Sequence, residues 1–174
     1  MQAARTKRQI TKQIASIFDP LGLLSPFTIG AKIFVQQLWK LKVNWDDPLS
    51  DDILEQWKDC AKGLGAVSQQ NIARRVAVLK NPEHDKPSVD YILLCFCDAS
   101  NLAYSCAVYL QVCQKNKTVA CDLVFAKARV APKKAISIPR MELLAILIGV
   151  RCLAFIKRKI EVPIARTVLW SDSK

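Results

Sequence analysis

The second half of the sequence constrains the fold most, because three apolar runs of strand length follow one another with only short polar turns between them. These runs are residues 91–97, 103–112 and 118–126. Connections as short as 100–101 and 114–117 favour antiparallel pairing of successive strands. A long apolar helical segment and a fourth strand-length run at 167–170 come next. This order of elements predicts a mixed sheet of the α+β or α/β class.

The helical segment is predicted to extend from about residue 139 to 159, with Pro139 near its first position. Three- and four-residue spacing puts one set of side chains on a common face: Glu142, Ala145, Ile146, Gly149, Leu153 and Ile156. Ala145 and Gly149 are small, so this helix can lie close against a sheet. If it crosses over the sheet, the strand at 167–170 runs parallel to the first strand.

A mostly helical region is predicted to precede the sheet. Its first helix is expected to start with Ser25 as the N-cap and Pro26 at the first helical position. The apolar face of this helix comprises Ile29, Ile33, Phe34, Leu38 and Leu41.

A second helix is predicted to complete a helical hairpin. Ser50 is its expected N-cap, and Asp51 and Asp52 lie in the first turn, where the helix dipole favours acids. Its predicted core residues are Ile53, Leu54 and Trp57. The helix is expected to end near Gly63 and Gly65.

The boundary between the two regions is expected within residues 81–88, which contain two prolines and three charged residues. Residues 72–79, just before this linker, are predicted to form a strand. The predicted domains are therefore a helical region of residues 1–86 and a sheet-containing region of residues 87–174.

The composition restricts the class of protein. The chain has 26 Lys and Arg against 15 Asp and Glu, a net charge of +11. No apolar run approaches the roughly 20 residues of a membrane span, and the N-terminus lacks the apolar core of a secretory signal. The 7 cysteines include no Cys-x-x-Cys pair, so they predict buried thiols in a reducing compartment and no zinc site. An intracellular protein is expected, in the cytoplasm or the nucleus, with no membrane partner and no small-molecule cofactor.

Three acids stand out because they lie within or at the end of strongly apolar segments: Asp98, Glu142 and Asp172. Desolvation disfavours a carboxylate there unless it is paired or bound to a metal. Taken singly, each acid also suits a solvated strand end or a helix start. With a helical crossover, Asp98 and Asp172 leave the sheet at one carboxyl edge, and Glu142 in the first helical turn completes a cluster. All-oxygen ligands select Mg²⁺ or Mn²⁺, and two such ions can support phosphodiester hydrolysis.

Basic residues gather between Asp122 and Glu142, where no acid occurs: Lys127, Arg129, Lys133, Lys134 and Arg140. A second group ends the long helix: Arg151, Lys157, Arg158 and Lys159. By itself, a basic loop is often only a solvated surface. Beside an acidic metal site, phosphate binding becomes the better interpretation.

Three blocks of the sequence resemble, in order, the active-site segments of the ribonuclease H domain in retroelement pol polyproteins. They are residues 96–104 (FCDASNLAY), 138–145 (IPRMELLA) and 170–174 (WSDSK). Another block is similar to the segment that joins reverse transcriptase to ribonuclease H in the Pao/BEL group of LTR retrotransposons. It comprises residues 17–26 (IFDPLGLLSP), Lys32 and residues 38–40 (LWK). The resemblance covers nearly the whole chain and is weakest between residues 66 and 89.

The resemblance implies that Asp98, Glu142 and Asp172 are metal ligands and that the substrate is the RNA strand of an RNA·DNA hybrid. It also implies that the remainder of a pol polyprotein is a partner. The family's fourth acid lies beyond a second helix and a fifth strand, past Lys174, and no Tyr-x-Asp-Asp polymerase motif occurs. The chain is therefore expected to be an excerpt with an incomplete sheet, exposed apolar surface and little or no nuclease activity alone.

Two other functions remain open. One is a non-catalytic nucleic-acid-binding protein that uses the basic residues for phosphate contacts, with affinity that falls steeply with salt and does not depend on the three acids. The other is a remnant of an element with no function, for which stable folding is not expected.

Overall fold

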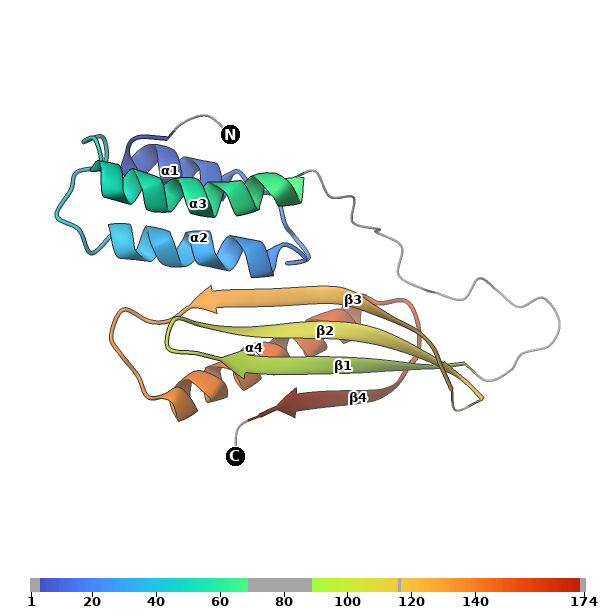
Figure 1. The fold of residues 1–174 in the computed structure, drawn as a ribbon. Helices are drawn as coiled ribbons and strands as arrows, with labels where there is room; N and C mark the ends of the chain where they lie inside the picture. Colours follow the sequence, from blue (N-terminus) through green and yellow to red (C-terminus); the bar gives the residue numbers. More distant parts are fainter. Residues whose placement is uncertain (1–3, 69–88, 116, 173–174) are drawn as a thin grey trace. The chain divides into compact units, whose positions relative to one another are not determined.

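The computed structural model describes residues 4–68, 89–115 and 117–172 of the chain (Figure 1). These residues form two compact units. One comprises residues 4–20 and 24–68, and the other comprises residues 21–23 together with the described residues from 89 onward. The predicted strand at 72–79 and the predicted linker at 81–88 lie outside the described residues.

Three helices form the first unit: α1 (Lys7–Ala15), α2 (Ser25–Leu38) and α3 (Asp51–Ser68). Their apolar faces share one core, whose most buried members are Ile10, Ala31, Leu38 and Trp57. The rings of Phe34 and Trp57 stack with their centroids 5.8 Å apart. The helical hairpin predicted for this region is present, with one helix added before it.

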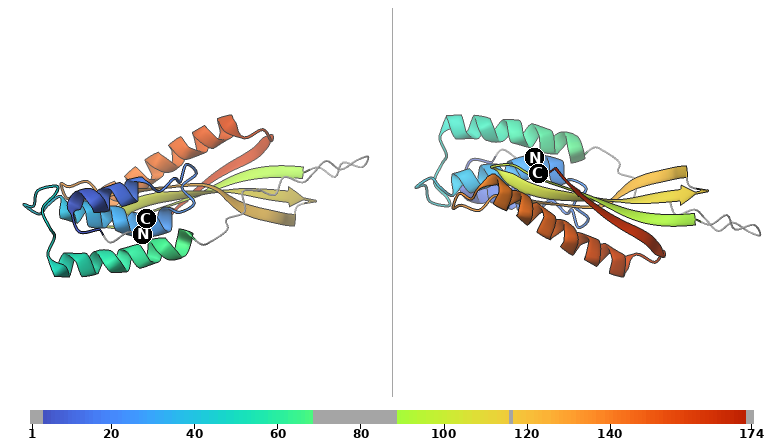
Figure 2. Two further views of the ribbon diagram at one scale, coloured as in Figure 1. Left: turned by 90° about the horizontal axis from the view of Figure 1, so that it is seen from above. Right: turned by 90° about the horizontal axis from the view of Figure 1, so that it is seen from below.

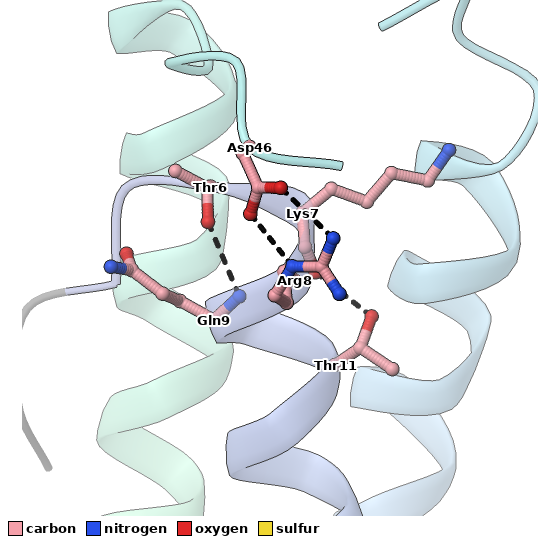
Figure 3. Close-up of polar contacts among 6 residues, drawn as sticks. All are labelled: Thr6, Lys7, Arg8, Gln9, Thr11 and Asp46. Carbon is pink, nitrogen blue, oxygen red and sulfur yellow. Dashed lines mark hydrogen bonds and ion pairs between the residues drawn. The ribbon is translucent and has the colours of Figure 1, made fainter. Parts of the chain in front are cut away.

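Helix α1 was not predicted, because its sequence is polar and offers only two apolar residues at helical spacing, Ile10 and Ile14. The side chain of Thr6 caps the helix by accepting a hydrogen bond from the Gln9 amide (Figure 3). Ile10 is fully buried, so one apolar turn is enough to hold this helix against α2.

Two predicted helix ends in this unit are wrong. Ser25 is the first residue of α2 and not its N-cap, because the backbone carbonyl of Leu24 accepts from the Thr28 amide. Helix α3 continues past Gly63 and Gly65 to Ser68. Neither glycine has the positive φ that ends a helix, and a helix interior tolerates glycine at a cost of about 1 kcal/mol each.

A segment before α3 is tied to the start of α1. Thr6 and Pro48 form an isolated β-bridge, and the Arg8 amide donates to the carbonyl of Trp45. The Arg8 guanidinium also makes two hydrogen bonds to the Asp46 carboxylate, at 2.7 and 2.9 Å (Figure 3). This exposed pair holds the pKa of Asp46 below its usual range, chiefly through the hydrogen bond from Arg8.

The second unit contains a four-stranded sheet with the order β3-β2-β1-β4. The strands are β1 (Val89–Ala99), β2 (Ala103–Gln114), β3 (Lys117–Val130) and β4 (Ile164–Ser171). Strands β1, β2 and β3 form an antiparallel meander, whereas β4 runs parallel to β1. The predicted mixed sheet and its helical crossover are therefore confirmed.

Helix α4 (Ile138–Lys159) lies along one face of this sheet, as both views of Figure 2 show. Four of the six residues predicted to share one face are buried, Ala145, Gly149, Leu153 and Ile156, whereas Glu142 and Ile146 are half-buried. A Cβ atom at Gly149 would lie 3.1 Å from the Cys95 Sγ and closer still to that of Cys97. Glycine therefore lets the helix backbone approach β1 directly.

The core between α4 and the sheet is apolar and rich in thiols. Its fully buried members include Leu93, Val108 and Leu110, and four of its residues are Cys95, Cys97, Cys106 and Cys152. The Sγ atoms of Cys95 and Cys97 are 3.7 Å apart. These thiols fill the core as small apolar groups, as the sequence predicts.

Candidate active site at the carboxyl edge of the sheet

Asp98 and Asp172 are placed together by the register of β1 and β4. Cys97 pairs with Ser171 across these two parallel strands. The next residues along the chain are Asp98, which is still in β1, and Asp172, which directly follows β4. Both side chains are exposed, and both leave neighbouring strands at the same edge of the sheet.

Asp98 is further ordered by the turn that follows it. Its Oδ1 accepts a hydrogen bond from the Ala99 amide at 2.7 Å. In the next turn, the Ser100 amide donates to the Ala103 carbonyl, and the Ser100 Oγ accepts from the Leu102 and Ala103 amides. The turn that follows Asp98 is therefore held in place by hydrogen bonds.

Glu142 belongs to the same end of the sheet, because α4 begins where β1 and β4 end (Figure 1). The Ala131 amide donates to the Leu102 carbonyl, which ties the segment before α4 to the β1–β2 turn. The sequence predicts Glu142 in the first helical turn. Because α4 starts at Ile138, Glu142 lies in the second turn instead. It is half-buried beside Met141, whose side chain is buried against the sheet.

The three acids offer only carboxylate oxygens, a donor set that suits Mg²⁺ or Mn²⁺. Their arrangement does not by itself make a metal centre. Among residues 4–68, 89–115 and 117–172, no group of three or more Asp, Glu, His or Cys side chains is placed to hold a metal ion. The fold thus brings two acids to adjacent strand ends and the third to the same edge, without a preformed ligand cage among the described residues.

The five basic residues predicted to contact phosphate belong to β3, to the loop before α4 and to α4 itself. Lys127 and Arg129 were expected in a loop. They belong instead to β3, where they pair with Cys106 and Tyr104 of β2. The loop before α4 carries Lys133 and Lys134, and α4 itself carries Arg140. Strand β3 runs in the same direction as β1, so its basic end lies at the edge that carries Asp98. All five side chains are exposed.

Lys127 also lies near the thiol cluster under α4. Hydrogen bonds from Cys152 and Cys95, and the nearby Lys127, lower the pKa of Cys106, whereas hydrogen bonding to Cys106 raises that of Cys152. All four thiols of the cluster are buried, so they are not accessible to a substrate. They support the site edge only by packing.

Two aromatic side chains near the site were not singled out from the sequence. Phe96 and Trp170 are neighbours across β1 and β4, and their exposed fractions are 46% and 57%. They precede Asp98 and Asp172 by two residues, so alternation along each strand puts them on the same face as the acids. This alternation is visible in the sequence and could have identified Phe96 and Trp170.

No helix in the described part of the chain is long and apolar enough to cross a membrane. A comparison with curated proteins finds no match. A family model, the Pao retrotransposon-like RNaseH-like domain, matches residues 6–173. The match includes all three helices of the first unit as well as the sheet, α4 and the three acids. The chain therefore belongs to the Pao retrotransposon-like RNaseH-like domain family.

Proposed function

We propose that this chain is the ribonuclease H-like part of a retrotransposon pol polyprotein that hydrolyses the RNA strand of RNA·DNA hybrids with two Mg²⁺ or Mn²⁺ ions. Asp98, Glu142 and Asp172 are the proposed metal ligands. The observation that carries the proposal is the pairing of Cys97 with Ser171, which sets Asp98 and Asp172 at the ends of adjacent parallel strands. The family match supports the retrotransposon origin.

The basic residues are the proposed contacts to the phosphates of the hybrid. Lys127 and Arg129 on β3 and Arg140 on α4 flank the acidic edge, and all three are exposed. We call the five residues Lys127, Arg129, Lys133, Lys134 and Arg140 the basic rim. Basic residues near a carboxylate centre let a polyanion approach acids that would otherwise repel it. We also propose that the helical unit joins this region to the reverse transcriptase of the same polyprotein.

The 174-residue chain alone is proposed to have little or no nuclease activity. The experiment compares the chain with the pol polyprotein on end-labelled RNA·DNA hybrid, RNA duplex and DNA duplex, with Mg²⁺ and with EDTA. Metal-dependent cleavage of the RNA strand of the hybrid by the polyprotein is expected. Equal cleavage of all three duplexes would contradict the proposed substrate, and robust cleavage by the chain alone would contradict its inactivity.

The exposed basic rim favours a second candidate function, a non-catalytic nucleic-acid-binding protein. This function predicts hybrid binding that weakens with salt and is unchanged by Asp98→Asn. Fluorescence anisotropy with a labelled hybrid in EDTA measures that binding without any contribution from catalysis. Salt-independent binding would rule out this function.

A further inference from the structure

Two tryptophans lie next to each other on the surface of the helical unit. Trp39 directly follows α2, and Trp45 lies between α2 and α3. Their ring centroids are 5.9 Å apart, with the ring planes at 79°, and their exposed fractions are 49% and 42%. Trp57, the third tryptophan of this unit, is 3% exposed and belongs to the core. The two outer indoles are not part of that core, and such exposed aromatic surface is typical of a binding site.

The backbone holds both tryptophans in place. The Trp39 amide donates to the Val35 carbonyl at 3.1 Å, which continues the hydrogen bonding of α2 by one residue. The Trp45 carbonyl accepts from the Arg8 amide at 3.0 Å, which ties its segment to α1. A ligand that binds to the two rings therefore has to order little of the chain, and this favours binding.

Lys7 brings a positive charge to the same rings. Its Nζ lies 5.3 Å from the centroid of the Trp45 ring. Lys7 is only 8% exposed, yet within the described part of the chain its ammonium makes no ion pair and no hydrogen bond. The neighbouring Arg8 is paired with Asp46, and Figure 3 shows the Lys7 side chain pointing away from that pair. A lysine this buried is normally paired, so an anionic ligand would complete its surroundings.

The other charges around the tryptophans also favour an anion. Lys40 and Lys42 lie between the two tryptophans in the sequence, and both are exposed. Asp47, the acid that follows Asp46, accepts hydrogen bonds from the backbone amide and the side chain of Asn44, at 3.2 and 2.9 Å. Both acids of this segment are therefore engaged, whereas none of the three lysines pairs with an acid among the described residues.

Flat aromatic surface beside cations suits the bases and phosphates of a single nucleic-acid strand. Unpaired bases stack on exposed indole rings, and lysines neutralise the phosphates between them. A duplex offers the same phosphates but keeps its bases stacked in its interior. An acidic peptide would pair with the lysines but would leave the indoles without a flat stacking partner.

We propose that Trp39 and Trp45, together with Lys7, Lys40 and Lys42, form a binding site for single-stranded nucleic acid, which we call the tryptophan platform. Bases stack on the indoles, and the lysines contact the flanking phosphates. The platform lies entirely within the helical unit, so it needs neither the three acids nor the basic rim. Its function is independent of the proposed nuclease activity.

The experiment measures fluorescence anisotropy with the 174-residue chain in EDTA. It compares two labelled single strands of about 12 nucleotides, oligothymidylate and an abasic strand with the same number of phosphates. The chain is expected to bind oligothymidylate at least about fivefold more tightly, because only this strand has bases to stack. Trp39→Ala is expected to remove this preference, and Trp39→Phe is expected to keep most of it.

Lys7→Met tests the buried cation while retaining its apolar stem. This substitution is expected to weaken the binding of both strands and to reduce the slope of log affinity against log salt by about 0.7, the value for one phosphate of a single strand. Circular dichroism checks that each variant folds. An unchanged slope in folded Lys7→Met would overturn the role of Lys7.

Two controls separate the platform from other surfaces. Phe27→Ala removes another exposed ring of α2, with an exposed fraction of 52%, and should leave the preference for oligothymidylate unchanged. R129Q/K134Q weakens the basic rim and should act on both strands alike. Equal binding of both strands by the unaltered chain, no binding at all, or a loss of preference in Phe27→Ala as large as in Trp39→Ala would overturn the proposal. So would tighter binding of phosphatidylserine vesicles that Trp39→Ala abolishes, because the tryptophans would then contact a lipid surface.

Discussion

Gly149 of α4 and Cys97 of β1 lie in direct contact, with no room for a Cβ atom between the helix backbone and the Cys97 Sγ. Gly149 shares its helix with Glu142, and Cys97 is the residue before Asp98. The contact therefore fixes the separation between the two elements that carry these acids. The arrangement of the acidic edge depends on this packing.

The first prediction concerns the substitution of Gly149 by alanine. Gly149→Ala is expected to destabilise the chain by about 1–3 kcal/mol, because the new methyl group overpacks the core against the thiols of Cys97 and Cys95. Chemical denaturation measures the free energy of unfolding. Gly63→Ala is the matched control, because Gly63 is also within a helix and a Cβ atom added to it would have no neighbour within 4 Å.

The control is expected to be stabilising, by up to about 1 kcal/mol, through helix propensity. In a double variant, Cys97→Ala is expected to recover part of the stability lost in Gly149→Ala. Additive effects of the two substitutions would show that the contact with Cys97 does not set the helix position.

The second prediction concerns thiol accessibility. Cys121 is exposed and Cys60 and Cys113 are half-buried, whereas Cys95, Cys97, Cys106 and Cys152 are buried. A colorimetric thiol reagent is expected to titrate Cys121 first and the four buried cysteines only after unfolding. Residual desolvation and the neighbouring Asp122 raise the pKa of the exposed Cys121 thiol, so the rate of its reaction with the reagent should still increase above the usual thiol pKa. Rapid reaction of all seven cysteines in the native chain would show that the core is not closed.

The third prediction concerns the ion pair of Arg8 and Asp46. The pKa of Asp46 is lowered in the folded chain, so the pair contributes stability above the ordinary carboxyl pKa and loses it as the pH falls through the lowered value. Both side chains are exposed, so we expect the pair to have a small effect on stability. Carboxyl NMR titration should show the Asp46 pKa returning toward its usual range in Arg8→Gln. An unchanged pKa would mean that the pair does not persist in solution.

The fourth prediction concerns the basic rim. The double variant R129Q/K134Q is expected to reduce the slope of log affinity against log salt by about 2 for a hybrid, about one for each phosphate that is no longer neutralised. The control K12Q/K58Q removes two exposed charges of the helical unit and should leave the slope unchanged. Equal effects of both variants would indicate that net charge, and not this rim, drives binding.

The sheet was predictable because its signals are local. Alternating and continuous apolar runs predict β1 to β4, and the short turns predict the meander. The parallel crossover follows from the length of the helix between β3 and β4. Small residues at Ala145 and Gly149 predict the helix face. These features depend on residues that are close in sequence.

Other features depended on contacts that no local pattern shows. Helix α1 is polar and is held by one fully buried residue, Ile10. Helix α3 continues beyond Gly63 and Gly65 because the packing around Trp57 outweighs the low helix propensity of glycine. Lys127 and Arg129 belong to β3 because this strand extends beyond the apolar run at residues 118–126. Roles of the three acids remain predictions, since spacing gives their order along the fold and not their ligands.

The proposed metal site is tested by the rate of hybrid cleavage by the pol polyprotein when single carboxylates are neutralised. Asp98→Asn and Asp172→Asn are each expected to lower the Mg²⁺-dependent rate at least about a hundredfold, because each would remove a metal ligand. Asp90→Asn is the control, because Asp90 is an exposed acid at the opposite end of β1, and its rate should be unchanged. Cleavage that proceeds at the wild-type rate in Asp98→Asn would contradict the proposed site.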